Sequence, residues 1–152
     1  MKKITRFVPV ALSLFVLLAS CKKDNSTATT TTTDPNDPST IITKGTWFVS
    51  SLTQRTEDKT LAFSGVTLTF SSNGTVSATD GSKSASGSWS SSKGGVTYYG
   101  SAPTVAALTI SFTSTPFDKI SKTWNVASEN NSNIHLDNKE PIEDEHLTLS
   151  KK

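Results

Sequence analysis

Apolar and polar residues alternate along much of the chain beyond residue 44. The clearest run is Ala106, Leu108, Ile110 and Phe112, where the positions between are small or polar. A two-residue repeat is typical of a β-strand that buries one face. Four further segments repeat this alternation, and three other short runs between turn residues bring the predicted strands to eight. They lie at residues 46–53, 66–70, 74–79, 85–90, 106–113, 124–126, 134–136 and 147–149.

Turn-forming residue pairs separate the early strands. Asn73-Gly74 lies between the second and third predicted strands, and Asp80-Gly81 lies between the third and fourth. Both pairs tolerate the positive φ angles that tight hairpins require. The sequence therefore predicts two successive antiparallel hairpins.

Two longer connections interrupt this succession of strands. Residues 91–103 form a loop rich in Gly and Ser. Residues 116–122 begin with a proline, which fits the first turn of a helix. We expect one or two helical turns here, with Phe117 and Ile120 facing inward.

Short turns and the absence of a long crossover favour an all-β fold, an eight-stranded antiparallel up-and-down barrel or curled meander with one short helix. Side chains can fill the interior of such a barrel, or it can hold one small ligand. Five large aromatic residues are available for the interior: Trp47, Phe70, Trp89, Phe112 and Trp124. A filled core is the default interpretation, since a ligand cavity needs some of these rings to stand aside.

The first 20 residues follow a different pattern. Lys2, Lys3 and Arg6 precede a mostly apolar run over residues 7–18, and small residues come directly before Cys21. This layout predicts a signal peptide over residues 1–20. Its last residues and Cys21 read LASC, which resembles the bacterial lipobox. That resemblance implies that Cys21 is lipidated and becomes the new amino terminus.

Two other interpretations of this segment fit less well. A transmembrane helix needs about 20 apolar residues, and this run is shorter. An ordinary secretory signal cut after Ser20 would leave Cys21, the only cysteine, as a free thiol. Lipidation accounts for that cysteine and supplies the two or more acyl chains that stable attachment requires.

Residues 21–43 link the predicted anchor to the strands. They contain a threonine run and two prolines but almost no apolar residues. Such a segment cannot offset the entropy lost on ordering. We expect a disordered tether that holds a domain at residues 44–152 roughly 25 Å from the bilayer. O-linked sugar on this Ser/Thr-rich segment is an alternative role.

Removal of the first 20 residues changes the charge balance. The full chain has 15 basic and 13 acidic side chains, and three of the basic ones leave with the signal peptide. The mature chain then has 12 basic and 13 acidic side chains, a net charge of -1. This balance excludes a basic surface of the kind that binds nucleic acid.

Candidate chemical groups are few. His135 and His146 fall on the outer face of the last two strands; if these strands pair, His146 lies near Asp137 and His135 near Thr148. A shallow metal site is an alternative interpretation of these residues, but no ligand-spacing motif supports it. The acidic residues within 140–145 suit a solvated loop better than a calcium site. Because no nucleophile motif is present either, we expect no enzyme activity, metal or cofactor.

Six segments carry a resemblance to a known family. They are GTW at 45–47, FSSNGTV at 70–76, GSW at 87–89, PFDKISKTWNV at 116–126, IHL at 134–136 and EHLTLSKK at 145–152. In order and spacing they resemble the lipocalin-like lipoproteins of Bacteroidota. The resemblance implies a small barrel anchored by lipid at the outer membrane, with no assigned ligand. It also implies that Trp47 packs at the closed end of the barrel beneath a basic side chain, with Lys151 the nearest candidate.

Two functions remain open at this point. The first is a binding module for a small apolar or amphipathic ligand, with Trp89, Tyr98 and Tyr99 as contacts near the connection between the fourth and fifth strands. The second is a structural or interaction protein with a filled core, which docks an envelope protein through its outer face. In both, the lipid on Cys21 makes the membrane a partner. The internal volume of the barrel distinguishes the two functions.

Overall fold

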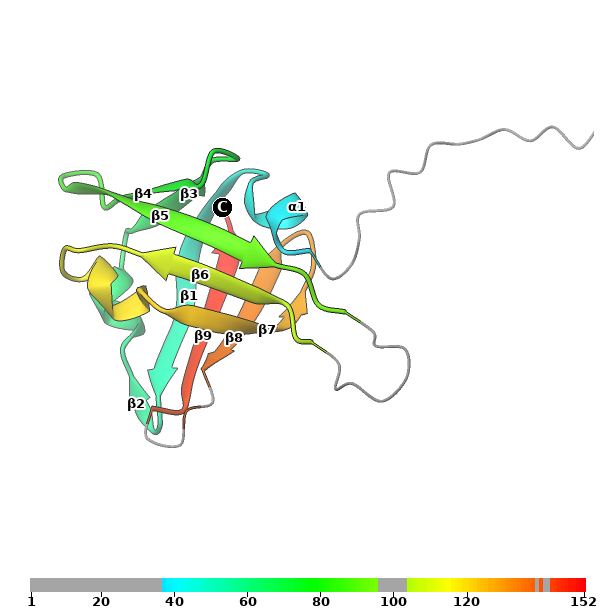
Figure 1. Cartoon of the computed structure of the whole chain (residues 1–152). Coiled ribbons are helices and arrows are strands. Elements are labelled where there is room, and N and C mark those ends of the chain that lie inside the picture. Colours follow the sequence, from blue (N-terminus) through cyan, green and yellow to red (C-terminus); the bar gives the residue numbers. More distant parts are fainter. Residues whose placement is uncertain (1–36, 96–103, 139, 141–142) are drawn as a thin grey trace, which may run out of the picture. The chain divides into compact units, whose positions relative to one another are not determined.

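A computed structural model describes residues 37–95, 104–138, 140 and 143–152 of the chain. Nine strands form one antiparallel sheet in this part (Figure 1). They are β1 (Thr46–Gln54), β2 (Glu57–Asp58), β3 (Thr67–Phe70), β4 (Thr75–Thr79), β5 (Ser84–Ser92), β6 (Ala107–Ser111), β7 (Thr123–Glu129), β8 (Asn133–Asn138) and β9 (Glu145–Lys151). The short helices are α1 (Ser39–Ile42), η1 (Thr60–Phe63) and η2 (Phe117–Ile120).

The sheet closes on itself because the first long strand pairs with the last. The strand order is β2-β1-β3-β4-β5-β6-β7-β8-β9, and β1 also pairs with β9. That pairing runs from Trp47 opposite Lys151 to Gln54 opposite Glu145. Eight strands therefore make a closed up-and-down barrel, and β2 is a two-residue addition to β1. The predicted fold class is confirmed.

Alternate residues of the eight barrel strands fill the inside of the barrel. Trp47, Trp124, Leu108 and Leu149 are all 0% exposed. The indole N–H groups of the three tryptophans donate to backbone carbonyls, at 2.8 Å for Trp47 to Ile42, 2.8 Å for Trp89 to Ser71 and 3.0 Å for Trp124 to Ile120. Buried indole groups normally need such a partner. The aromatic side chains thus form the core, as the default interpretation of the sequence expects.

A bulge adjusts the alternation in β1. The register against β9 shifts between Val49 and Ser51. Val49 and Leu52 both face the core, 4% and 2% exposed, although two residues, rather than one, lie between them. The extra residue, Ser50, stays outside and its hydroxyl donates to the Thr148 carbonyl at 3.2 Å. A β-bulge is the usual way to insert one residue without turning the rest of the strand inside out.

Short helices cover both ends of the barrel. α1 lies at the end where β1 begins and β9 finishes, while β2 marks the opposite end (Figure 1). At that opposite end η1 and η2 bury Phe63, Phe117 and Ile120. The helical turn expected at 116–122 is present as η2, with Phe117 and Ile120 facing inward as predicted. Among the described helices none is long and apolar enough to cross a membrane.

α1 belongs to the folded part of the chain. Ile41 and Ile42 are 7% and 0% exposed and join the core cluster. Asp37 accepts hydrogen bonds from the N–H and hydroxyl of Ser39, at 3.0 and 2.6 Å, and pairs with Lys93 at 3.3 Å. The division of the chain at residue 43 stays a prediction, but the core includes residues that the composition assigned to the tether. Two isoleucines in an otherwise polar segment were the available signal.

Replacement of Ile42 by alanine tests whether α1 is part of the core. We expect Ile42→Ala to lower the free energy of unfolding by about 3 kcal/mol, because it leaves a cavity beside Trp47. Urea denaturation followed by tryptophan fluorescence measures this loss. The exposed neighbour Lys44→Ala should change the value by less than about 0.5 kcal/mol. Equal small effects of the two variants would mean that α1 is not packed on the barrel.

Candidate functional site: a groove on the outer wall

The groove forms where β1 and β3 separate. Their pairing covers only Thr46 with Thr69 and Trp47 with Leu68, whereas β1 stays paired with β9 as far as Gln54. Beyond Trp47 the place next to β1 is taken by η1 and the residues that follow it. The connection is tied to β1 at Leu52, whose N–H donates to the Thr60 hydroxyl at 2.9 Å and whose carbonyl accepts from Lys59 N–H at 2.7 Å.

Apolar side chains line the middle of this groove. Its volume is about 670 Å³. Val49, Phe63 and Val66 are nearly buried beneath it, and Phe48 and Leu61 rise at its sides with 37% and 85% of their surface exposed. The full lining is Phe48, Val49, Ser50, Asp58, Thr60, Leu61, Phe63, Ser64, Gly65, Val66, Thr67 and Lys152. Large exposed apolar side chains that gather at one hollow are typical of an interaction site.

A charged residue lies toward each end of the groove. Lys152 follows Lys151, which pairs with Trp47, and Asp58 pairs with Thr53. Six residues of β1 separate these two levels, or roughly 20 Å of strand. Hydrogen bonds from the Thr60 hydroxyl and N–H lower the pKa of Asp58, so it is ionised at neutral pH. The groove thus offers a cation at one end, an anion at the other and an apolar floor between them.

Sequence reasoning missed this groove. Phe48 lies between the inward-facing Trp47 and Val49, so the alternation places it outside the barrel. A large aromatic residue at an outward position was therefore a usable signal. Leu61 gave no comparable signal, because the turn η1 that presents it was not expected.

Of the three predicted ligand contacts, Trp89, Tyr98 and Tyr99, the structure describes only Trp89. Trp89 is 8% exposed, and its ring meets the Phe70 ring edge to face with centroids 5.7 Å apart. Tyr98 and Tyr99, like the lipidation residue Cys21, lie outside the residues that the structure describes. Their role at a ligand site stays a prediction.

The two histidines lie where the predicted strand pairing places them. Asp137 is opposite His146, and His135 is opposite Thr148. His146 Nδ1 lies 2.8 Å from Asp137 Oδ1, and His135 Nδ1 lies 3.2 Å from Thr148 Oγ1. Over the described ranges, no group of three or more His, Cys, Asp or Glu side chains is placed to hold a metal ion.

A lysine organises the acidic connection between β8 and β9. Lys122 Nζ donates to Glu143 at 3.0 Å and to Glu145, which is 6% exposed, and it lies 5.5 Å from the centre of the Trp124 ring. Asn138 donates to Glu143 as well, at 2.9 Å. Burial acts to lower the pKa of Lys122, but its bonds to Glu145 and Glu143 outweigh burial and raise it. The same lysine lowers the pKa of Glu143.

Two further hollows occur at this end of the barrel. One of about 460 Å³ lies among Gln54, Arg55, Thr56, Glu57 and Glu143. The other, of about 270 Å³, lies beside Lys122 and Glu145 and includes Lys59 and Lys119. Both are lined mainly by polar and charged side chains, so the outer-wall groove is the more apolar of these hollows.

Comparison with known proteins gave no match to a protein family, to a curated protein or to a solved structure. The fold itself, a closed eight-stranded barrel, is compatible with a lipocalin-like architecture. Function must therefore be inferred from the residues of this chain.

Replacement of Lys122 tests the acidic cluster. Lys122→Met should lower the free energy of unfolding by about 2 kcal/mol at pH 7, because Glu145 is left buried without its partner. The exposed Lys119→Met should have little effect. Chemical denaturation at several pH values measures both variants.

The pH dependence of this difference follows from the two shifted groups. Glu143 has a pKa below its ordinary 4.5, so its favourable contribution is present at neutral pH and lost as pH falls through the lowered value. Lys122 has a pKa above 10.5, so its contribution is lost only as pH rises through that higher value. The difference in free energy of unfolding between wild type and Lys122→Met should therefore be smaller at pH 3 than at pH 7. A gap as large at pH 3 as at pH 7 would contradict the charge interaction.

Proposed function

We propose that this protein is a lipid-anchored envelope lipoprotein whose lipocalin-like barrel binds a small amphipathic molecule in the groove of its outer wall. The groove carries the proposal, because Phe48 and Leu61 stand exposed beside an apolar floor. We assign no catalytic step to the barrel.

The filled interior supports an outside site. Trp47, Leu108 and Trp124 are completely buried, and helices cover both ends. A ligand inside would have to displace several of these side chains and break the hydrogen bonds of the tryptophans. Native cores are packed to a density that leaves few spaces larger than a water molecule.

The lining of the groove indicates the chemistry of the ligand. Its volume of about 670 Å³ lies within the range of roughly 300 to 1,000 Å³ that is usual for small-molecule sites. The apolar floor suits a hydrocarbon or aromatic body, and Lys152 suits an acidic group at one end of that body. The ligand class is therefore an amphipathic acid.

The anchor forms the other half of the proposal. Cys21 stands 16 positions before Asp37, the first described residue. Lipid on its thiol would hold the barrel at the outer membrane, in reach of molecules that partition into the bilayer.

The exposed groove also favours a second function. Leu61, 85% exposed on the turn η1, is placed as an anchor residue for an envelope protein that docks on the outer face. Central apolar anchors of this kind contribute much of the energy of protein interfaces. If the wild-type protein binds no small molecule but co-purifies with one protein in a fixed ratio, this second function is favoured.

A fluorescent acid tests the groove. Dansyl-undecanoic acid should bind the mature protein, and Leu61→Ser or Phe48→Ser should weaken binding about 10-fold, the loss expected from one apolar contact. Val105→Ser is the matched control, since Val105 is also exposed, at 58%, but does not line the groove. Fluorescence titration gives the dissociation constants.

The charge at Lys152 is tested with the same probe. Lys152→Gln should weaken binding of the acid but leave binding of the corresponding dansyl alcohol unchanged. If wild type binds neither probe, or if Leu61→Ser and Val105→Ser behave alike, the small-molecule function is wrong.

Replacement of Cys21 tests the anchor. Wild type should fractionate with membranes and carry the additional mass of its acyl chains, because two or more chains give stable attachment. Cys21→Ser should lose that mass and the membrane association. Intact mass spectrometry and membrane flotation measure the two effects. An unmodified Cys21 in mature protein from its own host would exclude the lipoprotein assignment.

A further inference from the structure

Three lysines gather at the end of the barrel where β1 begins. Lys44 follows α1, and Lys151 and Lys152 lie at the end of β9. Lys152 N–H donates to the Thr46 carbonyl at 2.9 Å. We call Lys44, Lys151 and Lys152 the lysine patch.

Gly45 allows the backbone next to Lys44 to approach the Lys151 side chain closely. It has a φ of +111°, and a Cβ atom here would lie 2.8 Å from Lys151 Cε. Glycine adopts such a backbone conformation at no steric cost. The chain therefore turns from Lys44 into β1 directly beneath the Lys151 side chain.

The lysine patch has no acidic ion-pair partner within the part of the chain that the structure describes. Among the described residues no carboxylate forms an ion pair with Lys44, Lys151 or Lys152. Asp37, at the same end, is paired with Lys93.

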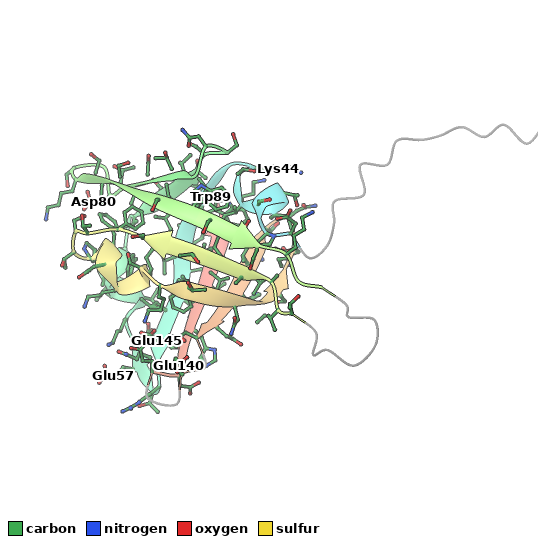
Figure 2. All side chains as sticks on the ribbon, viewed as in Figure 1. Lys44, Glu57, Asp80, Trp89, Glu140 and Glu145 are labelled. Atoms are coloured by element: carbon green, nitrogen blue, oxygen red, sulfur yellow. The ribbon has the colours of Figure 1, made fainter. Side chains whose placement is uncertain are left out.

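The opposite end of the barrel is acidic. Glu57, Glu140 and Glu145 lie together at the end marked by β2, and Lys44 lies at the other end beside α1 (Figure 2). Asp58, Glu143 and Asp144 belong to the same acidic connections. Basic side chains also lie at this end, namely Arg55, Lys59, Lys119 and Lys122, but the carboxylates outnumber them. Asp37 and Glu129 lie at the α1 end, where Lys93 and the lysine patch outnumber them. The described residues thus separate net charge along the barrel, negative at the β2 end and positive at the α1 end.

We propose that the lysine patch is a contact surface for anionic lipid headgroups, which holds the barrel with its α1 end toward the bilayer and its acidic end away from it. The orientation rests on the proposed lipid anchor, whereas the affinity of the patch for anionic lipid does not. Sixteen residue steps separate Cys21 from Asp37, and at full extension they reach at most about 55 Å. A tether of that length keeps the barrel near the membrane but does not choose which face meets it.

The lysines supply that choice. Each basic residue close to an anionic membrane strengthens binding by roughly fivefold. This attraction falls off within a Debye length, about 8 Å at physiological ionic strength, so only the end that touches the surface benefits. The acidic end is repelled over the same distance, and both effects favour one orientation.

The first test needs no lipid on the protein. The mature chain carrying Cys21→Ser should sediment with vesicles of phosphatidylcholine that contain roughly 30% phosphatidylglycerol, because the surface of such vesicles is negatively charged. Lys44→Glu combined with Lys151→Glu should reduce this binding at least 10-fold. The matched control, Lys83→Glu with Lys119→Glu, makes the same change in net charge away from the patch and should bind nearly as wild type does.

The two variant pairs leave the groove intact. Neither changes Lys152, which also lines the groove, so binding of dansyl-undecanoic acid by both should match that of wild type. If the Glu variants fail to fold, as judged by tryptophan fluorescence, Lys44→Gln with Lys151→Gln replaces them, and an intermediate loss is expected. The proposed lipid contact is wrong if the Cys21→Ser chain does not bind anionic vesicles, or if the two pairs of substitutions weaken vesicle binding equally.

The second test measures orientation in the lipidated protein. A single new cysteine carries a fluorophore at one of two positions. Asn131 lies in the turn between β7 and β8 at the α1 end, next to Ser132, whose carbonyl accepts from the Lys151 N–H at 2.8 Å. Ser82 lies in the turn between β4 and β5 at the opposite end. In anionic vesicles, a quencher at the lipid headgroup should quench a fluorophore at position 131 more strongly than one at position 82. The difference should shrink in pure phosphatidylcholine and in Lys44→Glu/Lys151→Glu. A difference that persists unchanged in both would assign the orientation to the tether and overturn the proposal.

Discussion

The pairing of β1 with β9 is the constraint on which the other features depend. It joins residues about 100 positions apart in the chain and removes both edges of the sheet, which would otherwise expose unpaired backbone groups. Because β1 is committed to β9 as far as Gln54, its early separation from β3 does not open the barrel. η1 fills the place that β3 leaves, and the groove lies over that junction. The same closure sets Lys151 beside Gly45 and so assembles the lysine patch.

Both ends of the barrel are closed by segments that are not strands, which is the reason for placing the proposed ligand site on the outer wall. α1 buries Ile42 at one end, and η1 and η2 bury Phe63, Phe117 and Ile120 at the other. A barrel that carries a ligand inside needs one open end, whereas helical turns close both ends of this barrel. Three large apolar side chains are exposed among the described residues, and two of them, Phe48 and Leu61, lie together at the groove on the wall. Exposed apolar side chains that gather beside a hollow are typical of an interaction site.

The parts of the fold that local pattern controls were predictable, and those that depend on distant contacts were not. Period-2 alternation located the strands, and Asn73-Gly74 located a hairpin in which Gly74 has a φ of +84°. The pairing of His146 with Asp137 followed from register alone. The sequence could not show that Lys122 reaches Glu145 across the barrel end, or that α1 packs on Trp47, because neither contact has a local signature. The groove needed both an outward Phe48 and the unexpected turn η1.

The attachment of α1 gives the barrel a defined response to mechanical force. A pull exerted through the chain at residue 37 acts first on α1, where burial of Ile41 and Ile42 and the bond from Trp47 to the Ile42 carbonyl resist it. If α1 detaches, the load passes to the start of β1 along the direction of the strand. If the barrel is held at its opposite end, the hydrogen bonds between β1 and β9 are then loaded together in shear instead of one at a time. Seven residues of α1 and its flanks can thus yield and lengthen the link before the closed barrel itself is stressed.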